Sequence, residues 1–144
     1  MQANDLSIAK QRLKQKDLAL VIAKKGAVVF ETSSHGIGGL LKAIEELDKK
    51  MKDSSVADRI VGKAAALLCV YAGVVAVFAV TASEKGIRAL RDNNIICRFG
   101  NEVPHILNYK RNDICPFEKL VINISDSKEA YEKLKSFAVE RRLI

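Results

Sequence analysis

Residues 64–83 read AAALLCVYAGVVAVFAVTAS, and this uncharged stretch decides the fold. A run of this length is long enough to cross a bilayer as a helix, but Gly73 divides it. The first half continues a helical pattern. The second half, Val74–Val80, is rich in β-branched residues, as in a strand buried on both faces. We therefore expect a buried helix, a turn and a central strand, and no membrane span.

The segments before this stretch predict a helix, a β-hairpin and a second helix. Asp5 is a good N-terminal cap for the first helix. Leu18–Lys24 and Ala27–Thr32 are strand-like runs separated by a short turn containing glycine, which is typical of a hairpin. The loop 33–39 is rich in serine and glycine and precedes leucines at helical spacing. The hairpin supplies the first antiparallel pair of the expected sheet.

The central helix is expected to begin at Ser55 and to run to about Tyr71, where Gly73 ends it. In the sequence SVAD, which starts at Ser55, Asp58 has the spacing of a capping box. In that motif the carboxylate accepts the backbone N–H of the capping residue. The pattern therefore places Asp58 in the first turn of a helix, at the mouth of the sheet.

Five more elements are expected after the uncharged stretch, each with its own start signal. They are a helix capped by Ser83, a strand at Ile95–Arg98, a strand at Glu102–Asn108 after a turn at 99–101, a helix beginning at Pro116, and a C-terminal helix capped within 125–127. A hairpin beside a strand–helix–strand unit gives a mixed sheet. Residues 1–144 are therefore expected to form one α/β domain, a three-layer α/β/α sandwich.

The composition limits the classes of function. The chain has 144 residues, of which 49% are hydrophobic, enough for a core without disulfides. A formal net charge of +7 attracts anions, but it is spread along the chain and few aromatics accompany it, so a nucleic-acid groove is not supported. Cys69, Cys97 and Cys115 lack the spacing of a disulfide framework or a zinc site. The polar start of the chain does not resemble a signal peptide, so a cytoplasmic protein is expected.

The segments Ser55–Ala66 and Cys115–Val121 carry a resemblance to a known family. They are similar to the two signature stretches of a microbial family of unknown function, which is classed with the cytidine-deaminase fold. The resemblance extends from about Leu6 to Leu134 and implies a cytidine-deaminase-like fold. It implies no particular activity, because the family has none that is settled.

The zinc site of true deaminases is not carried over by this resemblance. Those enzymes have His or Cys, then Ala, then Glu at the start of the central helix, and Pro-Cys-x-x-Cys where the next helix leaves the central strand. Here Val56–Asp58 is expected at the first place and Thr81–Gly86 at the second, with neither thiol nor imidazole. We therefore expect no metal site, no other cofactor and no zinc-dependent deamination.

Candidate site residues are chosen for their chemistry. Cys115, at an expected helix N-terminus, is a candidate nucleophile, with Asp58 and His105 as acid or base; each also has a plain structural interpretation as a packing, capping or surface residue. Lys63 follows Arg59 by four residues, which gives either a solvated cationic edge or an anion contact. Candidate ligand-binding residues are Ser55, Lys63, Ser83, Asn108 and Arg111.

Three functions stay open at this point. A deaminase-like sandwich without its metal would bind a nucleotide or another small anionic ligand beyond the strand ends, with the helices at Ser55 and Ser83 supplying N–H donors. An enzyme without zinc would use Cys115 as its nucleophile. A protein without a small ligand would form a homodimer through the C-terminal helix and the small-residue face at Gly62.

Overall fold

A mixed five-stranded sheet forms the centre of the molecule, in a computed structural model that describes residues 2–144. Its strands run in the order β2-β1-β3-β4-β5; β1 is antiparallel to β2 and β3, whereas β3, β4 and β5 are parallel. The strands are β1 (Leu20–Lys24), β2 (Ala27–Thr32), β3 (Ser55–Val61), β4 (Ala76–Ser83) and β5 (Ile96–Val103). The helices are α1 (Gln2–Gln15), α2 (Ile37–Leu47), η1 (Asp48–Met51, a 3₁₀ helix), α3 (Lys63–Ala72), α4 (Glu84–Asp92), α5 (Pro116–Leu120) and α6 (Ser127–Glu140).

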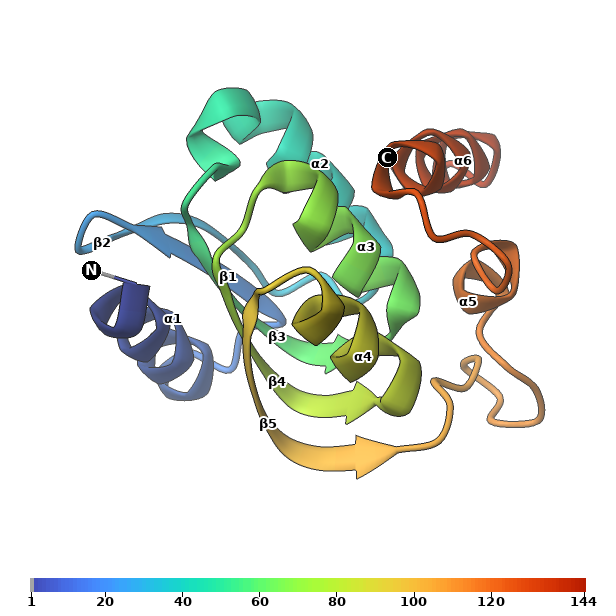
Figure 1. Cartoon of the computed structure of the whole chain (residues 1–144), viewed down its shortest axis with the longest axis horizontal. Coiled ribbons are helices and arrows are strands. Elements are labelled where there is room, and N and C mark those ends of the chain that lie inside the picture. The colour runs from blue at the N-terminus through green and yellow to red at the C-terminus, as the bar shows by residue number, and fades with distance from the viewer. Residues whose placement is uncertain (1) are drawn as a thin grey trace.

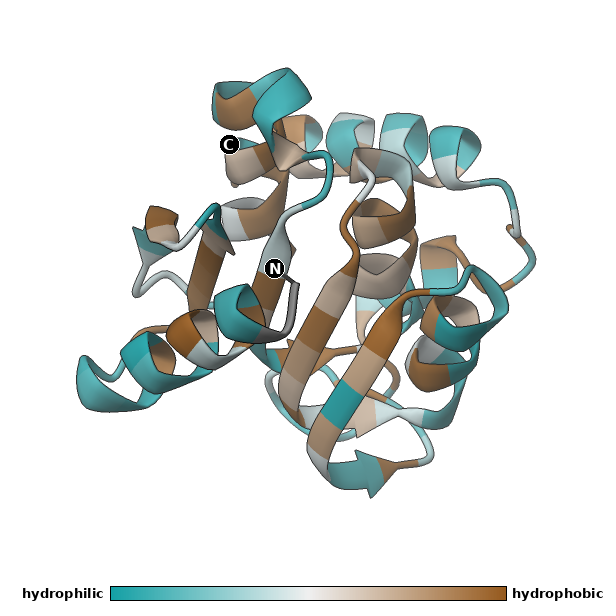
Figure 2. Cartoon of the chain, turned by 60° about the vertical axis from the view of Figure 1, so that its left-hand side comes forward, coloured by the Kyte–Doolittle hydropathy of each residue, from teal (hydrophilic) through white to brown (hydrophobic). Residues whose placement is uncertain are grey.

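Helices cover both faces of the sheet, which gives the expected three-layer α/β/α sandwich (Figure 1). One face packs on α1, where Ala9 and Leu13 meet Ala57 of β3 and Phe78 of β4. The other face packs on α2, α3 and α4, and α6 lies outside α3. Figure 2 shows the hydrophobic colours concentrated on the central strands and the hydrophilic colours on the outer helices. The fold prediction is confirmed.

The uncharged stretch is a helix followed by a strand, as predicted. Helix α3 ends at Gly73, whose left-handed backbone (φ 81°) lets its N–H reach the last carbonyls of the helix. Strand β4 then begins at Ala76 and lies between two parallel neighbours. Both its faces are covered, because Phe78 packs with the α1 side of the core and Val77 with the α3 and α4 side. No helix among residues 2–144 is long and apolar enough to span a membrane.

The segment Ser55–Val61 is strand β3, so the prediction that the central helix begins at Ser55 is wrong. Valine and isoleucine at 56, 60 and 61 favour a strand, and both edges of the segment are paired, with β1 on one side and β4 on the other. This pairing outweighs the capping-box spacing of Ser55 and Asp58. The helix begins only after Gly62, at Lys63.

A second correction concerns the last strand. β5 is continuous from Ile96 to Val103, where a turn at 99–101 and two short strands were expected. Gly100 produced the expectation of a turn, but it lies inside the strand, and a Cβ at this position would come within 2.9 Å of the Val80 carbonyl oxygen. His105 therefore lies in the loop that follows β5 and not in an edge strand.

Asp5 does not cap α1, because the helix already begins at Gln2. Its carboxylate instead accepts the backbone N–H groups of Lys25 (3.1 Å) and Gly26 (2.8 Å), and the residue is buried. This contact ties the first helix to the hairpin turn. Two other expected caps are present: the Ser83 hydroxyl accepts the Gly86 N–H at 3.0 Å, and Asp126 caps α6.

Candidate functional site

A cavity of about 280 Å³ opens where β3 ends and α2 and α3 begin, and we call it the site pocket. Such a position, beyond the carboxyl end of a parallel strand, is where open α/β sheets bind ligands. The polar side chains that line the site pocket come from four separate segments of the chain. They include His35, Asp58, Asn108, Cys115 and Glu118, and the apolar wall includes Ile37, Ala65, Ile106 and Phe117.

Asp58 is the acidic group that β3 presents to the site pocket. Side chains alternate along a strand, and Val56 belongs to the core beneath α2 and α3, so Asp58 projects to the same side. The carboxyl is partly buried, and burial raises its pKa from 3.8 to about 7, opposed by the backbone N–H groups of Ile60 and Arg59. The Ile60 N–H is a distant donor, at 3.4 Å from Oδ1. Asp58 is therefore a carboxyl that changes charge near neutral pH.

Glu118 of α5 closes the N-terminus of α3. Its Oε1 accepts the Lys63 backbone N–H and its Oε2 accepts that of Ala64, each at 2.8 Å. A helix N-terminus has unsatisfied N–H groups and a partial positive charge, so a carboxylate is stabilised there. Gly62 makes the approach possible, since a Cβ at 62 would stand 2.4 Å from Oε1. The anion-binding end of α3 is thus already filled by a side chain of the same protein.

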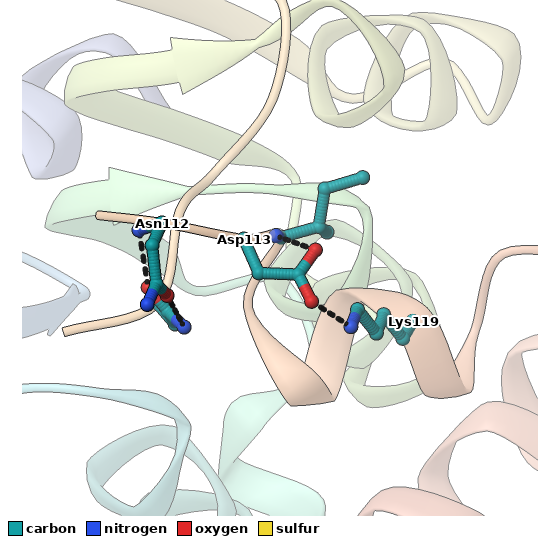
Figure 3. A network of polar contacts seen from close by, with 5 residues as sticks. Asn112, Asp113 and Lys119 are labelled. Carbon is teal, nitrogen blue, oxygen red and sulfur yellow. Dashed lines mark hydrogen bonds and ion pairs between the residues drawn. The ribbon is translucent and has the colours of Figure 1, made fainter. Parts of the chain in front are cut away.

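The loop 104–115 forms the outer wall of the site pocket, and internal hydrogen bonds hold it in place. Asn108 Nδ2 donates to Asn112 Oδ1 at 2.8 Å, and Asn108 Oδ1 accepts the Asn112 N–H at 3.2 Å (Figure 3). Asp113 accepts the N–H of Ile114 and forms an ion pair with Lys119 of α5 (Figure 3). These contacts connect the loop to α5, which carries Glu118.

Cys115 stands at the N-terminal end of α5 and lines the site pocket with Asp58. It is partly exposed, whereas Cys69 and Cys97 are buried. Burial raises the pKa of both buried thiols, and the nearby Asp58 raises that of Cys69 further. Cys115 is therefore the thiol with access to a ligand.

The other predicted site residues lie in different places. Lys63, Ser83 and His105 line a small adjacent cavity of about 20 Å³, which also touches Glu118. Ser55 is buried at the first position of β3, at the opposite end of the strand from the site pocket, and begins no helix. Arg111 lies exposed in the loop, with a left-handed backbone (φ 58°). The structure thus gathers Asp58, Asn108 and Cys115 around one cavity and leaves the others outside it.

Arg59 and Lys63 do not form the expected pair on one helix. Arg59 belongs to β3 and projects toward α1, where its guanidinium donates to the carbonyls of Leu18 (2.8 Å) and Leu13 (3.0 Å). Lys63 is the first residue of α3, and its ammonium donates to the Ile122 carbonyl at 3.2 Å. Because β3 ends between the two residues, they point to different sides of the sheet.

The residues present do not fit a deaminase zinc site. The central strand of the sheet is β3, and the helix that leaves it, α3, begins Lys63-Ala64-Ala65-Ala66, with no thiol. The preceding helix, α2, begins just after His35, which leaves one imidazole at the edge of the site pocket. Within residues 2–144, no three His, Cys, Asp or Glu side chains gather as a metal-binding group. The placement of Val56–Asp58 at a helix start was wrong, but the corrected positions also lack the two thiols that bind zinc in deaminases.

Three pocket residues were missed as site residues by sequence reasoning. His35 was treated only as part of the serine- and glycine-rich loop 33–39 that precedes a helix, and its imidazole was not named as a site group. Glu118 caps a helix that begins 55 residues earlier, and no local pattern signals such a contact. Phe117 contributes an aromatic ring that also packs edge-on against Phe137 of α6.

Comparisons with known proteins place this fold among its relatives. A family model described as TM1506, a domain of unknown function (DUF1893), matches residues 8–138. The crystal structure of a DUF1893 family protein from Thermotoga maritima is 26% identical, covers 94% of this chain and 91% of its own, and has a TM-score of 0.86. No curated protein matches.

Two larger proteins share the fold at a greater distance. RibD from Acinetobacter baumannii is 14% identical, with a TM-score of 0.53 over 68% of this chain and 35% of RibD. A diaminohydroxyphosphoribosylaminopyrimidine deaminase/5-amino-6-(5-phosphoribosylamino)uracil reductase from Thermotoga maritima is 13% identical, with a TM-score of 0.51 over 83% of this chain and 41% of that protein. At these identities the likeness shows the cytidine-deaminase-like fold alone.

Proposed function

We propose that this chain, which belongs to the DUF1893 family of domains of unknown function, binds a nucleotide, whose base occupies the site pocket. The observation that carries the proposal is Asp58, a carboxyl with a pKa raised to about 7, in the wall of a concave and largely apolar cavity. Pockets of this kind, with few polar groups and a perturbed titratable residue, are typical ligand sites.

The chemistry of the pocket wall favours a flat heterocycle with N–H donors. The ionised Asp58 presents two acceptor oxygens, and the one hydrogen bond that it accepts from Ile60 is long. The exocyclic amino group of a base such as adenine or cytosine would donate its N–H groups to these oxygens. Phe117 and Ile37 offer apolar surface for the ring faces. The volume of about 280 Å³ suits a small ligand rather than a peptide.

Binding assays with adenosine, cytidine and their 5′-monophosphates test this proposal. We expect saturable binding by calorimetry, and at least about tenfold weaker binding in Asp58→Asn, because the amide replaces one acceptor with a donor. Ligand N–H groups stabilise the ionised carboxyl, so binding near pH 7 should release protons, measurable in buffers of different ionisation enthalpy.

Asp53→Asn is the matched control, since it makes the same chemical change on an exposed residue before β3. Equal affinities of the two variants would contradict the role of Asp58. The absence of binding by all four probes at millimolar concentration would contradict the proposed function.

A second candidate function is an enzyme that uses Cys115, because Cys115 and Asp58 line the same cavity. The thiol would be the nucleophile and Asp58 the group that accepts or returns a proton. His105 is a weaker choice for that role, since it lines the adjacent small cavity.

Labelling of the native protein with iodoacetamide tests the accessibility of Cys115. We expect Cys115 to react at least about tenfold faster than Cys69 or Cys97, because the last two are buried and burial raises the pKa of each thiol. A bound nucleoside should slow the labelling of Cys115 if the ligand lies in the site pocket. Mass spectrometry of the peptides measures the labelling of each cysteine. Equal, slow modification of all three would contradict this second candidate.

A further inference from the structure

A recess between α3 and α4 carries three cations, and we call it the basic groove. Its volume is about 410 Å³, and its charged lining is Lys63 from α3, Lys85 and Arg88 from α4, and one acid, Asp92. Lys85 and Arg88 are three residues apart on a helix, so they project from the same face toward Lys63. Asn93 and Ser125 add polar groups to the wall.

The cations of the basic groove are poorly neutralised by the protein itself. Within residues 2–144, neither Lys85 nor Arg88 forms an ion pair. Burial and the nearby charge of Lys85 lower the pKa of Lys63, while Glu118 opposes this shift. The Glu118 oxygens are already held by the backbone of α3, and Asp92 lies one turn beyond Arg88. An anion in the groove would relieve the repulsion between the cations.

The basic groove is next to the site pocket. Gly62 lines the site pocket, and the following residue, Lys63, lines the groove. The small cavity between them shares Glu118 with the site pocket and Lys63, Lys85 and Ile122 with the groove. A ligand that extends from one recess to the other passes over the beginning of α3. Because Glu118 occupies the backbone amides there, an anionic group would be held by side chains.

We propose that the basic groove binds the phosphate of a nucleotide whose base lies in the site pocket. This inference rests on the proposed function and names the part of the ligand that gives the affinity. Lys63 contributes a charge oriented by the Ile122 carbonyl, Lys85 a second charge, and Arg88 a guanidinium that binds two phosphate oxygens. The contacts are exposed enough that their strength falls with salt.

Calorimetry with pairs of probes separates the phosphate from the base. For wild type in low salt, we expect adenosine 5′-monophosphate or cytidine 5′-monophosphate to bind at least about tenfold more tightly than its own nucleoside. In the double variant Lys85→Gln/Arg88→Gln the ratio of nucleotide affinity to nucleoside affinity should fall to about one, while nucleoside affinity stays the same. The control Lys49→Gln/Lys50→Gln removes the same charge from η1, at the other end of β3, and should keep the ratio. Thermal unfolding checks that each variant is folded.

Other outcomes overturn the inference in distinguishable ways. Equal affinity of nucleosides and nucleotides for wild type would remove the phosphate site and leave the proposed function standing. A ratio that falls equally in the control would show that net charge, and not the groove, attracts the phosphate. Inorganic pyrophosphate could bind through Lys85 and Arg88 while Asp58→Asn changes the affinity of no nucleoside or nucleotide. In that case the groove would be an anion site unrelated to a nucleotide. If no probe binds, both proposals fail.

Discussion

The position of Asp58 in the fold strongly raises the pKa of its carboxyl, and this links the stability of the protein to pH. Asp58 lies on the face of β3 that packs on α2 and α3, with one long hydrogen bond from Ile60. In the unfolded chain its pKa is near the ordinary value of 3.8, and in the folded protein it is about 7. Between these two values the folded state keeps a proton that the unfolded state has lost. The Asp58 contribution to the free energy of unfolding therefore falls as pH rises from about 4 to about 7.

We expect Asp58→Asn to become more stable relative to wild type across this pH range. The difference in free energy of unfolding between the variant and wild type should increase by at least about 1 kcal/mol from pH 4 to pH 8, because the amide has no charge to desolvate. Urea denaturation at several pH values measures it. Asp53→Asn, on an exposed residue, should show no comparable increase. A constant difference for Asp58→Asn would mean that burial does not raise the Asp58 pKa.

At the scale of elements, the junction of α3 with α5 depends on the absence of a side chain at Gly62. The backbone at Gly62 is extended (φ −101°), so alanine is acceptable there by conformation. The obstacle is the Glu118 carboxylate, which a Cβ would approach to 2.4 Å. Glycine at this position is therefore explained by the approach of a carboxylate to two amides.

A double-mutant cycle tests this explanation. Gly62→Ala should displace the carboxylate and destabilise the protein by about 1–2 kcal/mol, as loss of a helix cap does. Glu118→Ala should cost about the same, and Gly62→Ala should cost little more in the Glu118→Ala background, since the two changes break the same contact. Chemical denaturation of the four proteins measures the coupling. Additive losses would show that Gly62 serves some other purpose.

The helices and strands differ in how well local sequence patterns predict them. The body and end of helix α3, the turn at Gly73 and strand β4 follow from residues that are neighbours in sequence, and these were predicted. Strand β3 was assigned to a helix because the spacing of Ser55 and Asp58 is local, whereas the strand is decided by its pairing with β1 and β4. Local propensity is weak beside such tertiary pairing.

For the molecule as a whole, the fold class was predictable because a hairpin, a buried strand and amphipathic helices admit few arrangements. The site was predictable only in part. Asp58, Asn108 and Cys115 were identified by their chemistry, and they meet around one cavity. The contact of Glu118 with α3 joins residues 55 apart, and the basic groove needs α3 beside α4. Lys85 and Arg88 carry a local signal, two cations three residues apart, but only the packing places Lys63 opposite them.

The Glu118 contact also has a consequence for protein synthesis. The ribosome releases the start of α3 long before residue 118, so the two amides at Lys63 and Ala64 emerge without their partner. If the sheet and α3 form before α5 follows, the N-terminal amides of α3 are open to water or to another carboxylate. A residue made 55 positions later thus completes the start of α3, and a chain arrested before Pro116 lacks the carboxylate that covers the positive end of that helix.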